Sequence, residues 1–241
     1  MGIATTMRRA LGGELPERYV PEFWLRTFRE RVEESLRPGQ AILDVGSGRA
    51  PAVPPAERPA GVHYVGLDIS SAELAAAQEG SYDERVTGDV SRFIPELEGR
   101  FDLALSYQVF EHVKPLPAAL GHIHRYLKPG GVMVAQLSGT FSVFGLLNRV
   151  VPSRFATWAL ERFLNRAPES VFPAFYDRCW HSALARALQP WPSVEIIPLY
   201  TGADYLAFVR PLQALYLGFE DLAWRGDRRN LASYYIIVAR T

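Results

Sequence analysis

The sequence predicts an α/β fold built on a mostly parallel sheet. Two apolar runs, at residues 42–44 and 64–68, each end in a carboxylate, and a third segment at 85–90 ends beside another. Between them, Ser70 and Glu73 have the spacing of a capping box, and the strong helix formers of 74–77 follow. Apolar strands that alternate with helical segments in this way are typical of α/β domains.

The first run leads into Gly46-Ser47-Gly48, where two glycines let the backbone approach a ligand without an obstructing Cβ atom. Asp44, at the end of that run, only accepts hydrogen bonds when ionised, so it can hold an ammonium group or order a water molecule. A dinucleotide-binding fingerprint requires a third glycine, and Arg49-Ala50-Pro51 stands there instead.

The acid that ends the second run, Asp68, follows Gly48 by 20 residues. In an open parallel sheet, an acid at this distance lies at the end of the neighbouring strand and accepts hydrogen bonds from ribose hydroxyls. Two further strands are expected at 101–106 and 132–137. A helix is expected over 118–127, because its apolar residues recur at helical spacing.

These motifs together resemble the class I S-adenosylmethionine-dependent methyltransferases that act on small molecules. The matching motifs are Leu43-Asp44-Val45-Gly46-Ser47-Gly48, Val65-Gly66-Leu67-Asp68, Gly88-Asp89-Val90, Phe101-Asp102-Leu103, Phe110-Glu111-His112-Val113 and Leu127-Lys128-Pro129-Gly130-Gly131. They stand in the family's order over residues 40–140. The resemblance implies a Rossmann-like, seven-stranded, mostly parallel sheet with helices on both faces and a helical cap. It also implies an antiparallel edge pair at 194–199 and 234–239.

The resemblance further implies S-adenosylmethionine as the cofactor and assigns its contacts. Asp44, Gly46, Ser47 and Gly48 would line its methionine end, Asp68 would bind the ribose hydroxyls with Ile69 on the adenine, Asp89 would accept from the adenine amino group beside Val90, and Tyr107 and Gln108 would lie near the sulfonium.

The chain departs from the family between the first two strands, where a full helix is usual. Residues 49–61 contain Pro51, Pro54, Pro55 and Pro59. Proline lacks the backbone donor and costs about 3 kcal/mol inside a helix. This connection is therefore expected to be a loop or a single short turn.

Composition limits the classes of partner. The 241 residues carry 26 basic and 26 acidic side chains, and this balance argues against nucleic acid. The single cysteine, Cys179, excludes an intrachain disulfide and a cysteine-based metal cluster, and no metal site is expected. Residues 1–13 lack the apolar core of a signal peptide and no apolar run is long enough to span a membrane, so a cytoplasmic location is expected.

We expect a single methyltransferase domain over residues 1–241, with its cofactor-binding core at 40–138. Residues 1–39 are expected to form an N-terminal helical segment with a helix at 21–36. That helix covers the cofactor site or simply packs on the sheet.

Two insertions leave alternatives open. The aromatic stretch 139–173 is a cap insertion that forms a lid over the substrate, a helical hairpin packed on the protein, or a peripheral membrane contact through 141–170. Residues 174–241 begin with a helix at 174–189 and complete the sheet. Their 203–230 insertion is expected to be a wall of the substrate pocket or a contact in a homodimer.

Methyl transfer to a hydroxyl or an amine is assisted by a general base. His112, just after the strand at 101–106, is the first candidate, and the alternative is a histidine that caps or packs at the next helix. His181 is the second candidate, and its alternative is a partly exposed helix position. Tyr107 and Tyr176 are candidates to orient the acceptor.

The leading hypothesis is a methyltransferase that modifies a small apolar or aromatic acceptor, with O-methylation favoured over N- or C-methylation. One alternative is a cofactor-binding regulatory or assembly subunit without catalysis. A second, a nicotinamide-dependent oxidoreductase, lacks the third glycine and the helix that should follow it. A third, RNA methylation, would require a basic stripe beside the pocket.

Overall fold

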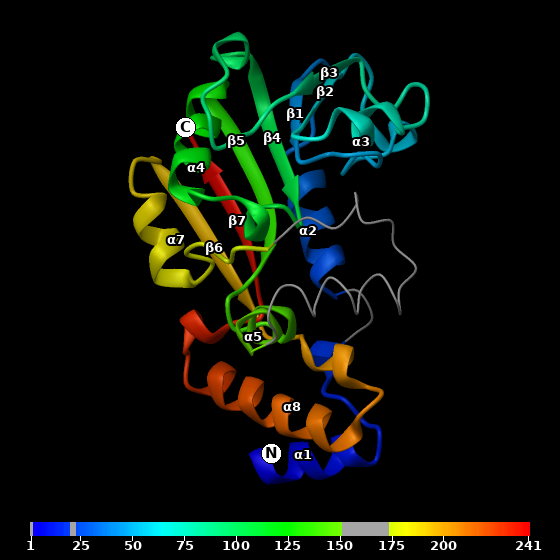
Figure 1. Ribbon diagram of the computed structural model, residues 1–241, viewed down its shortest axis with the longest axis vertical. Coiled ribbons are helices and arrows are strands. Elements are labelled where there is room, and N and C mark those ends of the chain that lie inside the picture. Colours follow the sequence, from blue (N-terminus) through cyan, green and yellow to red (C-terminus); the bar gives the residue numbers. More distant parts are fainter. Residues whose placement is uncertain (1, 20–22, 151–173) are drawn as a thin grey trace.

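The computed structural model describes residues 2–19, 23–150 and 174–241. One seven-stranded sheet runs through the molecule in the order β3-β2-β1-β4-β5-β7-β6 (Figure 1). The strands are β1 (Ala41–Val45), β2 (His63–Asp68), β3 (Glu84–Thr87), β4 (Phe101–Tyr107), β5 (Leu127–Ser138), β6 (Ser193–Leu199) and β7 (Tyr234–Arg240). This architecture confirms the predicted α/β fold.

Strands β3, β2, β1, β4 and β5 are parallel, whereas β7 is antiparallel to both of its neighbours, β5 and β6. The predicted antiparallel pair at the sheet edge is therefore confirmed. In the register of the sheet, Val45 pairs with Leu67 on one side and with Ser106 on the other. The turns that follow β1, β2 and β4 consequently meet at one edge of the sheet.

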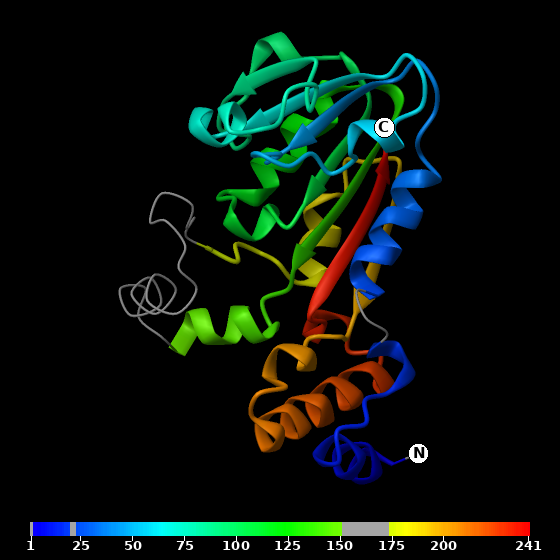
Figure 2. The ribbon, with the colours of Figure 1, turned by 90° about the vertical axis from the view of Figure 1, so that its right-hand side faces the viewer.

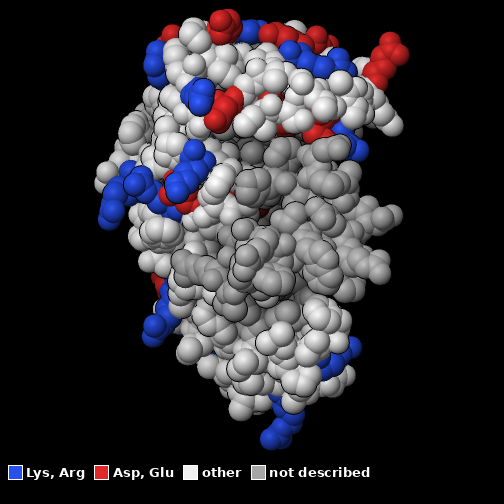
Figure 3. Space-filling view, in the orientation of Figure 1, with Lys and Arg blue, Asp and Glu red and all other residues white. Residues whose placement is uncertain are grey.

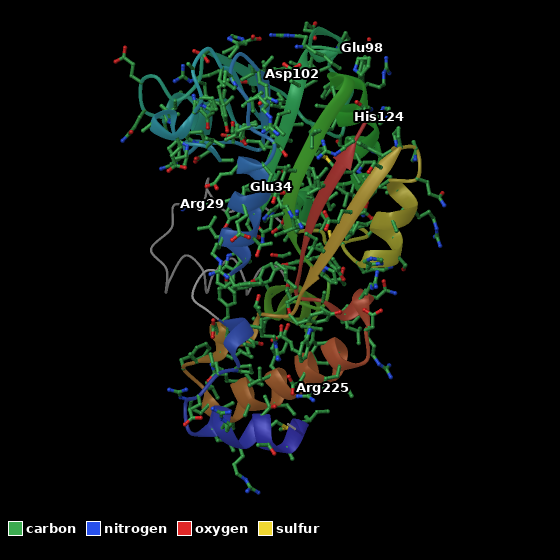
Figure 4. All side chains as sticks on the ribbon, turned by 180° about the vertical axis from the view of Figure 1, so that it is seen from behind. Arg29, Glu34, Glu98, Asp102, His124 and Arg225 are labelled. Atoms are coloured by element: carbon green, nitrogen blue, oxygen red, sulfur yellow. The ribbon has the colours of Figure 1, made fainter. Side chains whose placement is uncertain are left out.

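At the opposite end of the parallel strands, one carboxylate joins β1, β4 and β5. Asp102, near the start of β4, accepts hydrogen bonds from the Ala41 backbone N–H at 2.8 Å and from Lys128 Nζ at 2.8 and 2.9 Å. Asp102 and Arg225 lie toward opposite ends of the molecule (Figure 4). Because Asp102 lies near the start of its strand, it is far from the turns that follow β1 and β2.

Helices cover both faces of the sheet (Figure 2). On one face lie α4 (Leu116–Tyr126) and α7 (His181–Ala187), and on the other lies α2 (Phe23–Glu33). The buried residues Phe28 and Val32 anchor α2 in the core. The short helix α3 (Ser71–Ala75) begins as predicted, because Ser70 Oγ accepts a hydrogen bond from the Glu73 N–H at 3.2 Å.

The helices α1 (Ile3–Leu11) and α8 (Arg210–Arg225) pack together beyond one end of the sheet (Figure 1). Helix α5 (Val143–Val150) lies between them and the end of β5. The buried Asp221 fixes this layer, because it accepts a hydrogen bond from Thr6 Oγ1 at 2.9 Å and pairs with Arg18 at 2.8 Å. Helix α8 lies within the 203–230 insertion, where the sequence predicts only a connection between strands.

The structure confirms the loop predicted at 49–61 and shortens the helix predicted at 174–189. The proline-rich segment 49–61 contains only a short 3-10 helix, Pro55–Glu57, so the predicted loop is confirmed. The helix expected at 174–189 begins only at His181, because Tyr176 and Arg178 have positive φ angles of 49° and 59°. Residues 151–173 of the cap insertion lie outside the described residues, and so does most of the segment 141–170.

In the described ranges, none of the helices combines the length and apolar character that a membrane crossing requires.

Candidate functional site

A cavity of about 470 Å³ opens at the edge of the sheet where β1, β2 and β4 end. This size falls in the range of about 300–1,000 Å³ that small-molecule sites occupy. Its wall is formed by Gly46, Leu67, Asp68, Ile69, Gly88, Asp89, Val90, Gln108, Val109, His112, Val113, Lys114 and Phe175. Many of these residues are apolar, and their ionisable groups are the carboxyls of Asp68 and Asp89, the imidazole of His112 and the amine of Lys114.

A glycine is required at position 46 for packing as well as for the close approach of a ligand. Its φ is +71°, and a Cβ atom built there would lie 2.4 Å from both γ-carbons of Val109. Real Cβ atoms do not approach so closely, so Val109 fills the space that the absent side chain leaves. The glycine therefore joins the turn after β1 to the turn after β4, and both turns line the cavity.

Asp68 ends β2 on the cavity wall and organises the turns on either side. Its Oδ2 accepts a hydrogen bond from the Gly48 N–H at 2.9 Å, and its Oδ1 accepts one from the Ser70 N–H at 2.8 Å. Burial raises the pKa of this carboxyl. Each carboxylate oxygen has two lone pairs, so both can accept further hydrogen bonds from a ligand.

The adenine-side residues predicted from the family also line the cavity. Asp89 Oδ1 accepts a hydrogen bond from the Ser91 N–H at 2.8 Å, which fixes the carboxyl at the turn after β3. Ile69 is 60% exposed and offers an apolar surface, while Val90 is buried. Its carbonyl lies 3.0 Å from His122 Nδ1, which holds the Val90 backbone in place.

Asp44 does not line the cavity. Its Oδ2 accepts hydrogen bonds from the Ala52 N–H at 2.7 Å and from Tyr64 Oη at 2.8 Å. Burial raises the pKa of the Asp44 carboxyl to about 6. The Arg58 guanidinium lies 3.6 Å from the centre of the Tyr64 ring. Asp44 thus anchors the proline-rich loop that replaces the expected family helix.

Ser47 and Gly48 are also absent from the cavity wall. Both of their carbonyl oxygens accept hydrogen bonds from Tyr82 Oη, at 3.0 and 3.1 Å. The hydroxyl of Ser47 is buried, and a Cβ atom on Gly66 would lie 2.8 Å from it. These two residues hold the turn from behind while Gly46 faces the cavity.

Tyr107 is the last residue of β4 and Gln108 follows it, and of these two only Gln108 lines the cavity. Gln108 has a φ of +57°, and its Oε1 accepts a hydrogen bond from Ser138 Oγ at 2.9 Å. The Tyr107 ring instead packs against Phe28 of α2, with ring centres 5.1 Å apart. Helix α2 therefore covers the sheet beside the site, and Tyr107 forms its contact surface.

His112 ends a short 3-10 helix, Phe110–His112, and lies on the cavity wall. Its neighbour Glu111 is buried, and burial raises the pKa of the Glu111 carboxyl. The Glu111 carbonyl accepts hydrogen bonds from the Phe175 N–H at 2.8 Å and the Tyr176 N–H at 2.9 Å. The segment that begins at Ala174 is therefore tied to the turn that carries His112, and Phe175 completes the wall.

His181 lies elsewhere. It is the first residue of α7, where its backbone bonds to the Tyr235 hydroxyl and its imidazole lies near Arg229 and Asp227. Burial lowers the pKa of this imidazole. The structure separates it from the residues that line the cavity, so the two candidate histidines do not belong to one site.

Six residues of the wall have no site role assigned from the sequence, and they are Leu67, Gly88, Val109, Val113, Lys114 and Phe175. Leu67, Gly88 and Val113 stand inside the quoted motifs, and Val109 and Lys114 flank one of them, so the motifs with one flanking position on each side contain all five. Phe175 had no such signal, because only the backbone pairing with Glu111 brings it to the cavity.

In the part of the chain that the structure describes, no group of three or more histidine, cysteine or acidic side chains is arranged to hold a metal ion. The polar groups of the cavity fit an adenosine-containing ligand better. Acceptors at Asp68 and Asp89 lie at successive strand ends beside the apolar Ile69 and Val90. That arrangement matches the hydroxyls, amine and flat ring of an adenosine.

Comparisons with known proteins agree with this fit. A family model described as "Methyltransferase domain" matches residues 17–186. A ubiquinone biosynthesis O-methyltransferase from Paramagnetospirillum magneticum is 37% identical over 122 residues, which are 48% of this chain and 49% of that protein. The chain thus spans about half the length of the curated relatives it matches.

Solved structures share the fold. Phosphoethanolamine N-methyltransferase 2 from Haemonchus contortus, in complex with S-adenosyl-L-methionine, aligns with a TM-score of 0.56 at 14% identity, over 90% of this chain and 52% of that chain. An S-adenosylmethionine-dependent methyltransferase from Mesorhizobium loti aligns with a TM-score of 0.51 at 19% identity, over 92% and 98% of the two chains. The family model covers more than half of the sequence, and the chain therefore belongs to the methyltransferase domain family and shares its fold with solved S-adenosylmethionine-dependent methyltransferases.

Proposed function

We propose that this protein transfers a methyl group from S-adenosylmethionine to an oxygen atom of a small apolar or aromatic acceptor. The observation that carries the proposal is a cavity at the carboxyl edge of the sheet that combines Asp68 and Asp89 with His112. Ligands of open α/β sheets bind at this edge.

In this proposal the cofactor occupies the cavity through the wall residues predicted from the family. Asp68 accepts hydrogen bonds from the ribose hydroxyls and Asp89 accepts one from the adenine amino group, with Ile69 and Val90 against the ring. Gly46 and Gln108 lie beside the methionine end. Asp44, Ser47, Gly48 and Tyr107 act by positioning these residues, since their contacts are with the surrounding protein.

The bound cofactor supplies an electrophilic methyl group, and the protein supplies alignment and exclusion of water. Val109, Val113 and Phe175 give the cavity an apolar surface that an aromatic or aliphatic acceptor can contact. His112 would accept the proton of the acceptor hydroxyl as the new O–C bond forms and the bond from the methyl group to sulfur breaks, with the neutral thioether as the leaving group. His181 has no part in this step, because it lies away from the cavity.

Two further observations support methylation of an oxygen atom in a small molecule. Several curated relatives carry the name ubiquinone biosynthesis O-methyltransferase. The chain has equal numbers of basic and acidic side chains, whereas domains that bind nucleic acid are usually strongly basic. Both observations therefore favour a small-molecule acceptor.

The test is transfer of a tritiated methyl group from S-adenosylmethionine into extracts that are then partitioned between water and organic solvent. The proposal expects label in the organic phase, in a product that resists mild alkali as an ether does and an ester does not. Cofactor binding without transfer to any extract component would favour the non-catalytic subunit instead. Label confined to RNA would contradict the proposal.

A further inference from the structure

Helix α8 exposes an apolar stripe along most of its length. Leu212, Leu215 and Leu222 are 45%, 61% and 52% exposed, and Phe219 between them is half-buried. Residues three and four positions apart lie on one face of a helix. From residue 211 to residue 223, every exposed side chain of α8 is apolar.

The other faces of α8 are already packed. Asp221 is buried against Thr6 and Arg18, and Glu220 is buried with hydrogen bonds to Tyr19 and Ser233. A helix that is apolar on its remaining face as well is normally covered on all sides. The stripe is therefore suited to contact something outside the described chain.

Neighbouring side chains widen the stripe. Phe208, just before α8, is 82% exposed. Helix α1 packs closely at Gly218, where an added Cβ atom would lie 2.9 Å from Met7 Sδ. Leu11 is one turn beyond Met7 on the same face of α1, and it is 54% exposed.

Most of the exposed charges near the stripe are basic, and the exposed carboxylates Glu14 and Asp227 are paired with Arg9 and Arg229. Arg210 begins α8, Arg225 ends it, and Arg8 is exposed on α1. The carboxylates of α8 are turned inward, as described above. In Figure 3, the surface where α1 and α8 lie is mostly uncharged, and the charged side chains that appear there are blue. Trp224, 52% exposed, lies between Arg18 and Arg225.

We propose that this stripe, formed by Phe208, Leu212, Leu215, Phe219 and Leu222, docks the protein on an anionic lipid bilayer. Apolar and aromatic residues on one face with flanking arginines are the features of a helix that lies in a membrane interface. A second copy of the chain fits less well, because antiparallel packing of two stripes would bring Arg210 against Arg225, and the one carboxylate beside Arg225, Asp221 at 3.2 Å, is buried in its own helix. The inference goes beyond the methyl transfer proposed above and does not depend on it.

The test is flotation of the full chain with vesicles of phosphatidylcholine alone or mixed equally with phosphatidylglycerol. We expect binding to the mixed vesicles that falls with rising salt. The variants Leu215→Glu and Leu222→Glu should each lower the bound fraction at least about tenfold, and Arg8→Gln should lower it less. The control is Val194→Glu on β6, which changes a similarly exposed apolar residue outside the stripe and should bind as the wild type does. Thermal melting and cofactor binding establish that each variant is folded.

Three results would overturn the proposal. The first is that the wild type does not float with either vesicle. The second is that folded Leu215→Glu binds vesicles as tightly as the wild type. The third is a wild-type dimer in sedimentation experiments that Leu215→Glu dissociates, which would assign the stripe to a second copy of the chain.

Discussion

Asp44 and Asp68 end neighbouring strands, yet they face different surroundings. Asp68 lies on the cavity wall, where its oxygens retain lone pairs for a ligand. Asp44 is buried against Tyr64 and Ala52, and burial raises its pKa to about 6. The carboxylate that the family pattern assigns to the ligand therefore holds the loop after β1 in this chain instead.

The pKa of Asp44 predicts a measurable pH dependence of stability. Because its folded pKa lies above its unfolded value, its contribution is fully present below about pH 4 and is lost as pH rises through 6. The loss is about 3 kcal/mol of unfolding free energy. Asp44→Asn keeps an oxygen acceptor for Ala52 and Tyr64, so denaturant unfolding should show a flatter pH profile than the wild type.

Asp102→Asn provides the matched control for this measurement. The hydrogen bonds from Lys128 and Ala41 lower the pKa of Asp102, although burial opposes them. Its stabilisation is present at neutral pH and is lost as pH falls through the lowered pKa, which is the opposite sign. If the two variants changed the profile in the same direction, the burial account of Asp44 would be wrong.

His112 is expected to act on the rate and not on cofactor affinity. His112→Gln should lower kcat about 10²- to 10⁴-fold, because general-base assistance contributes that much. The Kd for S-adenosylmethionine should change less than about threefold, since the proposed cofactor contacts are made by other residues. Single-turnover rates over a pH series would measure this, and His181→Gln is the control. Equal losses in both variants would argue against His112 as the base.

Among the elements, the turns after β1 and β4 form one packed unit. Gly46→Ala should destabilise the protein by about 2–4 kcal/mol, from the positive φ angle and the clash with Val109. The double variant Gly46→Ala, Val109→Ala should recover part of that loss in a double-mutant cycle, because it removes the two 2.4 Å contacts with the γ-carbons but keeps the 2.9 Å contact with the Val109 Cβ and the backbone strain. Chemical denaturation measures each arm, and strict additivity would show that Val109 does not set the requirement for glycine.

The elements of the sheet could be predicted from the sequence and α8 could not, for one physical reason. Strands β1, β2 and β4 are buried on both faces, so their apolar runs stand out between turns. Helix α8 is apolar on its exposed side and buries Glu220 and Asp221, so its polar and apolar residues do not divide into an outer and an inner face. The prolines of 49–61 gave a reliable signal, because proline acts locally.

Some residues of the site could likewise be predicted from the sequence, and others could not. Asp68, Asp89 and Gln108 follow strands directly, and strand ends in a parallel sheet meet at one edge, so short motifs located them. The histidines required tertiary structure to tell apart. His112 is carried by the turn after β4, whereas His181 is carried to the β6 side of the sheet by α7. Phe175 reaches the cavity through backbone pairing that no sequence pattern encodes.

At the scale of the whole molecule, the functions proposed here lie at separate places. The cavity lies where the parallel strands end, and the apolar stripe lies on α8, in the layer that α8 forms with α1 beyond the sheet (Figure 1). Variants in α8 should therefore change membrane binding without changing cofactor affinity. Variants at Asp68 should do the reverse, because the two sets of residues share no contact among those described.

The central claim is that the cavity at the carboxyl edge binds S-adenosylmethionine through Asp68. Isothermal titration of the wild type, Asp68→Asn and Asp102→Asn with S-adenosylmethionine, and of the wild type with NAD, tests it most directly. We predict saturable binding of S-adenosylmethionine, at least about tenfold weaker in Asp68→Asn, which is about 1.4 kcal/mol. Asp102→Asn should bind as the wild type does and NAD should not bind. Equal affinity in Asp68→Asn and the wild type, or preferential binding of NAD, would contradict the account.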